Sequence, residues 1–417
     1  MKRTVVANSR ASLVWAILAC MLAACSGGGV STTPPSSAIS PEALRESKAS
    51  VWTLVSSPNE PLGTTGLYDD TLWGVGGSSP NDVWAVGNNC CHPHGSQDYY
   101  HALIEHWNGS GWKIVKFAKN EPADSQLRAV SATGPDDAWA VGYSVFPNAA
   151  LFEHWNGRRW SVVSSPYIYN GSEMLSVKAL SPTDAWAVGE GNGAAIAEHW
   201  DGKQWSYIPG YTMGGLTVLT GVAATASNDV MAIGNYYAPN ANLFSEHWNG
   251  TSWSYVAPLQ NTSIAQFNGV AAIGKSDYWA VGYQTPSSNV PQTLIERWTG
   301  GSKWSIVGSP NLDPPSGAPL FNTLNGVVSL SSKDAWAVGM WTWFYGDGTP
   351  RSLFERWNGR KWIVAAGPAT LETNNNNASN ELLGIARAGS GTLWAVGNQT
   401  IPPACCNETL TVETTHG

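Results

Sequence analysis

The stretch "WTLVSSP", residues 52–58, decides the fold of this chain. It closely resembles "WSVVSSP" at residues 160–166, which stands at the end of a longer recurring unit. "WTLVSSP", in contrast, comes before the first such unit. An element that ends other units but precedes the first one indicates that the two ends of the chain complete one unit together.

Seven segments mark the recurring unit, and their third residues are 45 to 58 positions apart. They are "DVWAVG" (82–87), "DAWAVG" (137–142), "DAWAVG" (184–189), "DVMAIG" (229–234), "DYWAVG" (277–282), "DAWAVG" (334–339) and "TLWAVG" (392–397). This period is typical of four-stranded propeller blades with loops of different length.

Each unit reads as four strands. A segment such as "LNGVVSL" (324–330) precedes the marker, and after a variable loop a segment such as "LFEHWNG" (151–157) and then one such as "WSVVSSP" follow it. Alternation of apolar and polar residues favours strands, and Asn-Gly or Asp-Gly between the third and fourth segments is a strong tight-turn signal. Few charged residues (12%) and 44 glycines also suit all-β structure.

The strand count explains the position of "WTLVSSP". Six fourth strands follow their third strands, whereas the seventh third strand, "LTVETTHG" (410–417), is followed by none. We therefore predict an all-β, seven-bladed β-propeller whose last blade is closed by the N-terminal strand, residues 51–58, which leaves no open sheet edge at the seam. Nineteen of the 23 Trp residues fall at three positions of this frame, as packing of blade on blade requires.

The units resemble the Trp-Ala-Val-Gly repeats of bacterial secreted propellers and, more loosely, kelch and galactose-oxidase blades. The likeness covers residues 50–417. A weaker similarity links turns such as "GRRW" (157–160) to the Asp-box of sialidase-like propellers, but the Ser-x-Asp that leads that box is missing. The resemblance implies a scaffold that carries both enzymes and pure binders, so it does not by itself assign a function.

The N-terminal residues read as an export signal. Lys2, Arg3 and Arg10 precede an apolar run that is shorter than the roughly 20 residues a bilayer needs. "LAAC" resembles a bacterial lipobox, which predicts a signal peptide over 1–24 and lipidation of Cys25; a plain cleaved signal is the alternative. Residues 25–49 are rich in Ser, Gly and Pro and form the expected flexible tether, and residues 50–417 form the propeller. We expect an exported protein, lipid-anchored to the bacterial cell membrane outside the cytoplasm.

Charge limits the partners. With 22 basic and 30 acidic residues the net charge is −8, and loss of the basic signal makes the mature chain more acidic. An acidic chain binds polyanions poorly, so we expect no nucleic-acid partner and no membrane contact beyond the lipid anchor. We expect a monomer without a cofactor.

The third strands repeat a Glu followed by His or Arg, a pair that could suggest catalysis. The Glu recurs in every unit, as Glu105, Glu153, Glu198, Glu246, Glu296, Glu355 and Glu413. An active site needs one constellation, so residues present in all seven units are interpreted as structural.

Function should lie in the parts that differ, chiefly the loops between second and third strands, which emerge on one face with the blade-to-blade connections. The aromatic residues of these loops are the predicted ligand contacts: Trp341, Trp343, Tyr345, Tyr99, Tyr143, Tyr236 and Tyr283. They offer stacking surfaces for a carbohydrate or anchors for a protein, unless the long loops bury their own rings.

Four cysteines remain beyond the signal and the lipobox: Cys90, Cys91, Cys405 and Cys406. Both pairs lie in second-to-third-strand loops of the first and last blades, which are neighbours once the ring closes. Export favours disulfides, either between the loops or within each pair. "CCHPH" (90–94) also admits a zinc or copper site with His92 and His94, but the oxidising compartment favours the disulfide, and no metal site is predicted.

No catalytic motif was found: the sequence has no Gly-x-Ser-x-Gly, no His-Glu-x-x-His and no phosphate-binding loop. We therefore predict a non-enzymatic, surface-anchored binding propeller. One alternative is a polysaccharide-acting hydrolase or lyase built on loop carboxylates such as Asp98, Glu190, Asp347 or Glu372, which two acids and a base meeting at the centre would support. The other is a structural lipoprotein that docks other envelope proteins.

Overall fold

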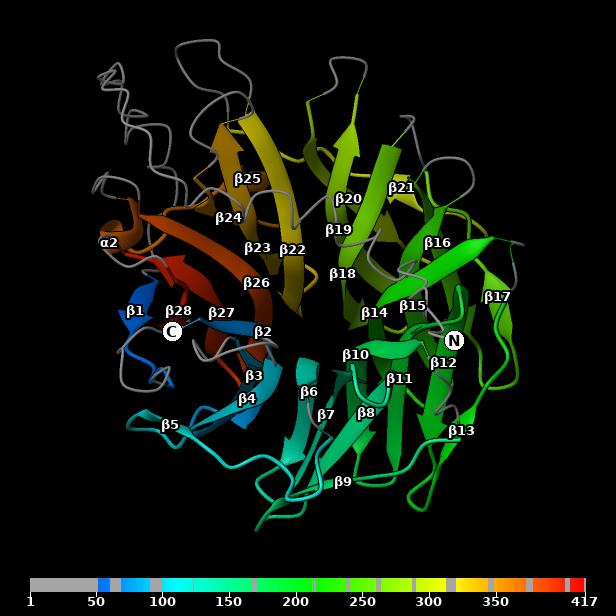
Figure 1. Cartoon of the computed structure of the whole chain (residues 1–417). Coiled ribbons are helices and arrows are strands. Elements are labelled where there is room, and N and C mark those ends of the chain that lie inside the picture. Colours follow the sequence, from blue (N-terminus) through cyan, green and yellow to red (C-terminus); the bar gives the residue numbers. More distant parts are fainter. Residues whose placement is uncertain are drawn as a thin grey trace, which may run out of the picture. The chain divides into compact units, whose positions relative to one another are not determined.

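The computed structural model describes residues 52–60, 69–90, 100–122, 124–166, 171–211, 213, 215–237, 241–259, 264–286, 290–312, 320–343, 349–372, 378–401 and 406–415. The side chains of Cys90, Ala369, Glu372 and Thr415 lie outside this description. The chain divides into two compact units, residues 1–37 and 38–417. The second unit contains the propeller, a ring of seven four-stranded antiparallel sheets (Figure 1). The predicted seven-bladed all-β propeller is confirmed.

Every blade has the same strand order, from a first, inner strand to a short fourth, outer strand. The first strands are β2 (Asp70–Ser79), β6 (Ser125–Gly134), β10 (Ser172–Ser181), β14 (Leu216–Ala226), β18 (Ile264–Gly274), β22 (Leu320–Ser331) and β26 (Ser379–Ala388). The second are β3 (Asp82–Cys90), β7 (Asp137–Ser144), β11 (Asp184–Gly191), β15 (Asp229–Tyr237), β19 (Asp277–Thr285), β23 (Asp334–Trp343) and β27 (Thr392–Thr400). The third are β4 (Tyr100–Trp107), β8 (Ala149–Trp155), β12 (Ala194–Trp200), β16 (Ala241–Trp248), β20 (Gln292–Trp298), β24 (Arg351–Trp357) and β28 (Glu408–Thr415). The fourth are β5 (Trp112–Ile114), β9 (Trp160–Val162), β13 (Trp205–Tyr207), β17 (Trp253–Tyr255), β21 (Ser305–Ile306), β25 (Trp362–Val364) and β1 (Thr53–Val55).

Blade 7 combines the two ends of the described chain, as predicted. β1 pairs antiparallel with β28, Leu54 opposite Val412, in the sheet β1-β28-β27-β26 (Figure 1). β1 is shorter than the expected strand over residues 51–58, and Trp52 lies just before it. The indole of Trp52 is 1% exposed and lies 5.5 Å from Trp336 and 5.2 Å from Phe354 of blade 6. The closing segment therefore fills the core between blades 6 and 7 as well as the sheet edge.

The frame tryptophans pack blade against blade. Trp84 of blade 1 lies 4.9 Å from Trp155 and 5.0 Å from Trp160 of blade 2. Trp394 of blade 7 makes the same two contacts, at 4.9 and 5.0 Å, with Trp107 and Trp112 of blade 1. These contacts show the ring closed by the same packing that joins its other blades.

The ring has two faces. We call "turn face" the side on which first strands turn into second strands and third strands into fourth, and "loop face" the side with the longer second-to-third-strand loops and the blade-to-blade connections. Among the described residues, the one helix, α2 (Ala369–Glu372), belongs to such a connection. No helix in the described ranges is long and apolar enough to cross a membrane.

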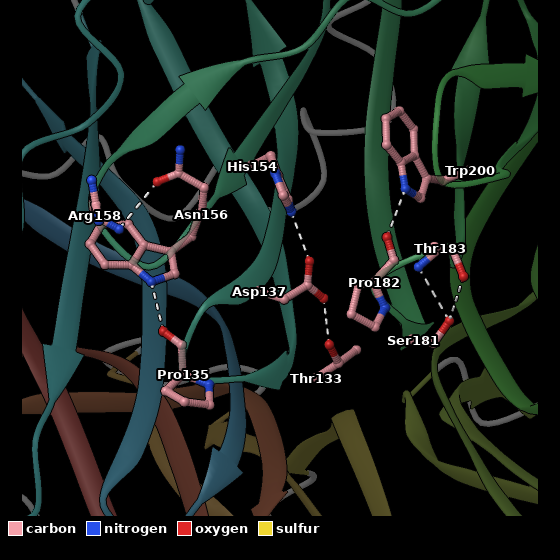
Figure 2. A network of polar contacts seen from close by, with 11 residues as sticks. Thr133, Pro135, Asp137, His154, Asn156, Arg158, Ser181, Pro182, Thr183 and Trp200 are labelled. Atoms are coloured by element: carbon pink, nitrogen blue, oxygen red, sulfur yellow. Dashed lines mark hydrogen bonds and ion pairs between the residues drawn. The ribbon is translucent and has the colours of Figure 1, made fainter.

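On the turn face of blades 1 to 6, the Asp that opens the repeat marker binds the His or Arg that follows the third-strand Glu. His154 Nε2 lies 2.8 Å from Asp137 Oδ1, and Thr133 donates a hydrogen bond to the same carboxylate (Figure 2). Arg297 and Arg356 replace the His in blades 5 and 6, bound to Asp277 and Asp334. In Figure 2, Trp200 Nε1 also donates to Pro182 O in the turn of its blade, at 3.1 Å.

In blades 2 to 6 the third-strand Glu joins the blade to the one before it. Five of these carboxylates are at most 1% exposed and accept a hydrogen bond from the segment after the preceding blade's fourth strand. The pairs are Ala118 N to Glu153 (3.1 Å), Ser165 Oγ to Glu198 (2.6 Å), Tyr211 N to Glu246 (2.7 Å), Leu259 N to Glu296 (3.0 Å) and Ser309 Oγ to Glu355 (3.0 Å). These contacts agree with the structural interpretation of the repeated Glu and His or Arg.

Candidate ligand-binding site

The predicted loop aromatics occupy the loop-face ends of several second strands. Trp341 and Trp343 end β23, half-buried, with ring centroids 6.4 Å apart. Trp341 also packs against the core between blades 5 and 6. Trp343 therefore has the better claim to a binding role, since the ring of Trp341 already serves partly in packing.

The predicted tyrosines are distributed around the face. Tyr283 of blade 5 lies 6.0 Å from Phe321 of blade 6, and burial raises the pKa of Tyr283 to about 12. Tyr236 packs partly against the core between blades 3 and 4, so its ring is partly buried by its own fold, as the alternative to ligand binding expected. Tyr143 is half-buried in blade 2. Tyr99 and Tyr345 lie outside the described residues.

A cavity of about 180 Å³ lies at the centre, lined by the first strands of all seven blades. It lies about halfway along these strands: its lining residues Trp73–Val75 and Arg128–Val130 are the fourth to sixth of the ten residues of β2 and β6. A register shift, a β-bulge, occurs there in every first strand. The bulge residues that line the cavity are Trp73, Arg128, Leu175, Thr220, Asn268, Asn325 and Leu383.

Close approach of the inner strands explains the small residue after each bulge. A Cβ at Gly74 would lie 2.7 Å from the carbonyl oxygen of Arg128 in the next blade. Such a contact is shorter than van der Waals packing permits, so a glycine lets blades 1 and 2 approach at this level. The bulge in turn re-aims one side chain per blade to the centre, which builds the cavity from otherwise regular strands.

Arg128 is the centre of a side-chain cluster on one side of the cavity. It is 9% exposed, and its guanidinium carbon lies 4.3 Å from the ring centroid of Trp73 and 5.4 Å from that of Tyr143. Arg128 Nη2 donates to the Tyr143 hydroxyl at 3.3 Å, and Trp73 Nε1 donates to Asn88 Oδ1 at 2.6 Å. Cation–π stacking of this kind fixes the plane of the guanidinium.

Two carboxyls of blade 3 complete this cluster. Glu173 and Glu190 are directly opposite each other on β10 and β11, so their side chains share one face of the sheet. Burial raises the pKa of Glu173, and the charge of Arg128 partly opposes that rise. Burial and the Glu173 charge raise the pKa of Glu190 to about 7, although Gly193 N donates to Glu190 Oε2 at 3.2 Å. We call Trp73, Arg128, Tyr143, Glu173 and Glu190 the mouth cluster.

Of the mouth cluster, only Tyr143 and Glu190 are candidates predicted from the sequence. The sequence does contain a signal for Trp73 and Arg128. Each follows a Leu and precedes a small residue and a Val, in "LWGV" (72–75) and "LRAV" (127–130). Tyr143 and Glu190 follow the Gly of the repeat marker directly. They occupy the same frame position in blades 2 and 3, a position whose residue differs from blade to blade.

The predicted cysteine chemistry is largely outside the description. Cys91, Cys405, His92 and His94 are not among the described residues, nor is the side chain of Cys90. Cys406 is half-buried. Within the described part of the chain, no three His, Cys, Asp or Glu residues are grouped as a metal site would need. Asp98, Asp347 and the side chain of Glu372 also lie outside the description, so the disulfides stay a prediction.

Fold and site together define a seven-bladed propeller with one polar and aromatic cluster at its centre. No protein-family model and no curated protein matches the chain. Among solved structures, YCF48 from Cyanidioschyzon merolae is similar, with TM-score 0.53 and 16% identity over 88% of this chain and 99% of that one. A structure titled "YCF48 bound to D1 peptide" gives TM-score 0.52 and 12% identity, over 89% and 98%. SapL1 lectin in complex with alpha methyl fucoside gives 0.45 and 14%, over 72% and 96%. The two YCF48 likenesses show the fold alone.

Proposed function

We propose that this chain is a surface-anchored, non-enzymatic binding propeller that holds a carbohydrate or protein ligand on its loop face. The observation that carries this proposal is the fixed guanidinium of Arg128 between Trp73 and Tyr143 at the central cavity. A preorganised cation with aromatic neighbours beside a cavity is a common design of ligand sites. The YCF48 structure titled as bound to D1 peptide supports a binding role for a propeller of this fold.

The first described residues of the chain lie on the turn face. β28 begins at the loop face, and β1 runs antiparallel to it, with Thr53 opposite Glu413 and Val55 opposite Thr411. Trp52 therefore lies at the turn face. The first described residue is therefore on the face opposite the one on which we propose that the ligand binds.

Capture by the isolated propeller tests this proposal. Residues 50–417 would be labelled and applied to immobilised oligosaccharides and to peptides of envelope proteins, as wild type and as Arg128→Ala. Arg351→Ala is the matched control, because it removes the same charge from the loop-face end of β24 in blade 6. We expect capture by wild type and by the control and a loss in Arg128→Ala. Equal capture by all three proteins would contradict the proposed site, and no capture by wild type would contradict the function.

A polysaccharide-acting hydrolase is a second candidate because two carboxyls of blade 3 lie opposite each other and one of them interacts with the charge of Arg128. Glu173 and Glu190 share one face of blade 3; burial raises the pKa of Glu173 against the charge of Arg128, and burial together with the charge of Glu173 raises the pKa of Glu190 to about 7. A carboxylic acid beside a carboxylate is the usual equipment for glycoside hydrolysis. Release of reducing ends from neutral and acidic polysaccharides, lost in Glu173→Gln and in Glu190→Gln, would support it. No release by wild type would remove this candidate.

A further inference from the structure

The central cavity is asymmetric in what its bulge residues do. In blades 4, 5 and 6 they join the next blade: Thr220 Oγ1 donates to Phe267 O (2.8 Å), Asn268 Nδ2 to Leu324 O (2.9 Å) and Asn325 Nδ2 to Leu382 O (2.8 Å). These side chains are committed to holding first strands together. That half of the cavity wall is structural.

The other four bulge residues are two leucines, one tryptophan and one arginine, in place of the threonine and asparagines of blades 4 to 6. Leu383 and Leu175 are hydrocarbon side chains that cannot make such bonds, and they flank Trp73 and Arg128 around the cavity. All four are adjacent, because blade 7 precedes blade 1 in the closed ring. We call Leu383, Trp73, Arg128 and Leu175 the open arc. An apolar and aromatic surface with one cation therefore occupies one side of the centre.

Acidic side chains outnumber basic ones around the open arc. Glu173 lies in blade 3, and Glu381 lies at the corresponding place in blade 7, where Asn398 Nδ2 donates to its Oε1 at 2.8 Å. Glu190 and Asp124 are also on this side of the ring. The charge of Asp124 raises the pKa of Tyr143, and the charge of Arg128 lowers it. One guanidinium among these carboxyls does not make an anion site, which disfavours acidic glycans and acidic peptides.

We infer that the open arc and the two carboxyls beside it bind a neutral carbohydrate. This inference rests on the proposed binding function and names its ligand class. A sugar ring has an apolar face for Trp73, Leu175 and Leu383 and hydroxyls that both donate and accept. Arg128 donates, and Glu173 and Glu190 accept. Burial and the charge of Glu173 raise the pKa of Glu190 to about 7, so Glu190 also donates when it is protonated.

The experiment is an affinity series on an array that holds neutral hexose oligosaccharides, uronate- and sialate-bearing oligosaccharides, and peptides. The variants are Arg128→Gln, Glu173→Gln and Trp73→Phe in residues 50–417. Gln266→Ala is the control, since Gln266 has in β18 the position that Glu173 has in β10, beside the hydrogen-bonded half of the cavity. Circular dichroism and the melting temperature show whether each variant is folded.

We expect wild type to bind neutral oligosaccharides and the first two variants to bind them at least about tenfold more weakly, which corresponds to about 1.4 kcal/mol. Gln266→Ala should keep its affinity. Binding of acidic glycans or peptides alone would overturn this inference and leave the proposed binding function standing. Neutral-glycan binding that survives both substitutions in folded protein would place the site elsewhere and overturn it as well. If wild type bound no oligosaccharide and no peptide on the array, both proposals would be contradicted.

Discussion

Leu54 and Val412 face each other across the antiparallel pair that completes blade 7. The contact extends beyond the strand, because Thr409 N donates to Asn59 Oδ1 at 2.7 Å and Ser57 Oγ lies 2.6 Å from Thr409 Oγ1. Strand pairing, hydrogen bonds and the buried ring of Trp52 thus act at one seam.

Removal of residues 1–58 should greatly destabilise the ring or cause aggregation, since it exposes the edge of β28 and empties the place of Trp52. Trp52→Ala alone should reduce the free energy of unfolding by about 3–5 kcal/mol. Thermal unfolding measures both, with a protein that starts at residue 50 as the control. If the truncated protein has the same melting temperature as the control, closure by β1 does not stabilise the ring.

Alanine at Trp343, together with Trp341 and Tyr345, tests the loop aromatics as a ligand surface. We expect the triple variant to lose glycan or partner capture while the ring stays folded, with some loss of stability because Trp341 packs against the core. Capture is measured on the array and folding by circular dichroism. Trp343→Ala is the cleaner single change. Unchanged capture would assign binding to the mouth cluster alone.

The buried third-strand glutamates should make stability depend on pH. Burial raises the pKa of Glu153, Glu198, Glu246 and Glu296 from 4.5 to about 7. The folded state then holds protons that the unfolded state releases, so this stabilisation is complete below about pH 4.5 and is lost as pH rises through about 7. Each carboxyl contributes up to about 3 kcal/mol to that change.

The melting temperature should therefore be higher at pH 5.5 than at pH 8. Glu198→Gln, which keeps an acceptor for Ser165, should reduce this difference. The depressed pKa values of Asp137 and Asp229 act in the opposite direction, but only as pH falls through them, below this window. A melting temperature that rises from pH 5.5 to 8 would contradict the assignment.

His154→Arg distinguishes a structural from a chemical role of the turn-face pairs. Blades 5 and 6 already use Arg297 and Arg356 on the same carboxylate position, so arginine should keep the bond to Asp137 and the stability. His154→Ala should cost about 1 kcal/mol, since the pair is partly exposed. Denaturant unfolding compares the two. Equal loss in both variants would show that the imidazole itself is required.

Peptide mapping without reduction tests the cysteines. We expect disulfides that involve Cys90, Cys91, Cys405 and Cys406, either between the two loops or within each pair. Bridges between the loops would lock the same seam that β1 closes. Mass spectrometry after proteolysis identifies the linked peptides, with a reduced sample as reference. Four free thiols would exclude both arrangements.

The sequence by itself determined the number of blades, the strand order and the closure, because each rests on a local pattern repeated seven times. The marker, the Asn-Gly turn and the Trp positions are short-range signals, and the unmatched "WTLVSSP" needed only a count. It also placed Tyr143 and Glu190 in variable positions.

Only the tertiary structure decided which variable residues meet. Trp73, Arg128 and Glu173 come from three different blades, and within each strand nothing marks them as neighbours. A bulge in each first strand turns one side chain to the centre, and closure of the ring brings these side chains together. Such contacts depend on the geometry of seven packed sheets, whereas the fold depends on patterns within one blade.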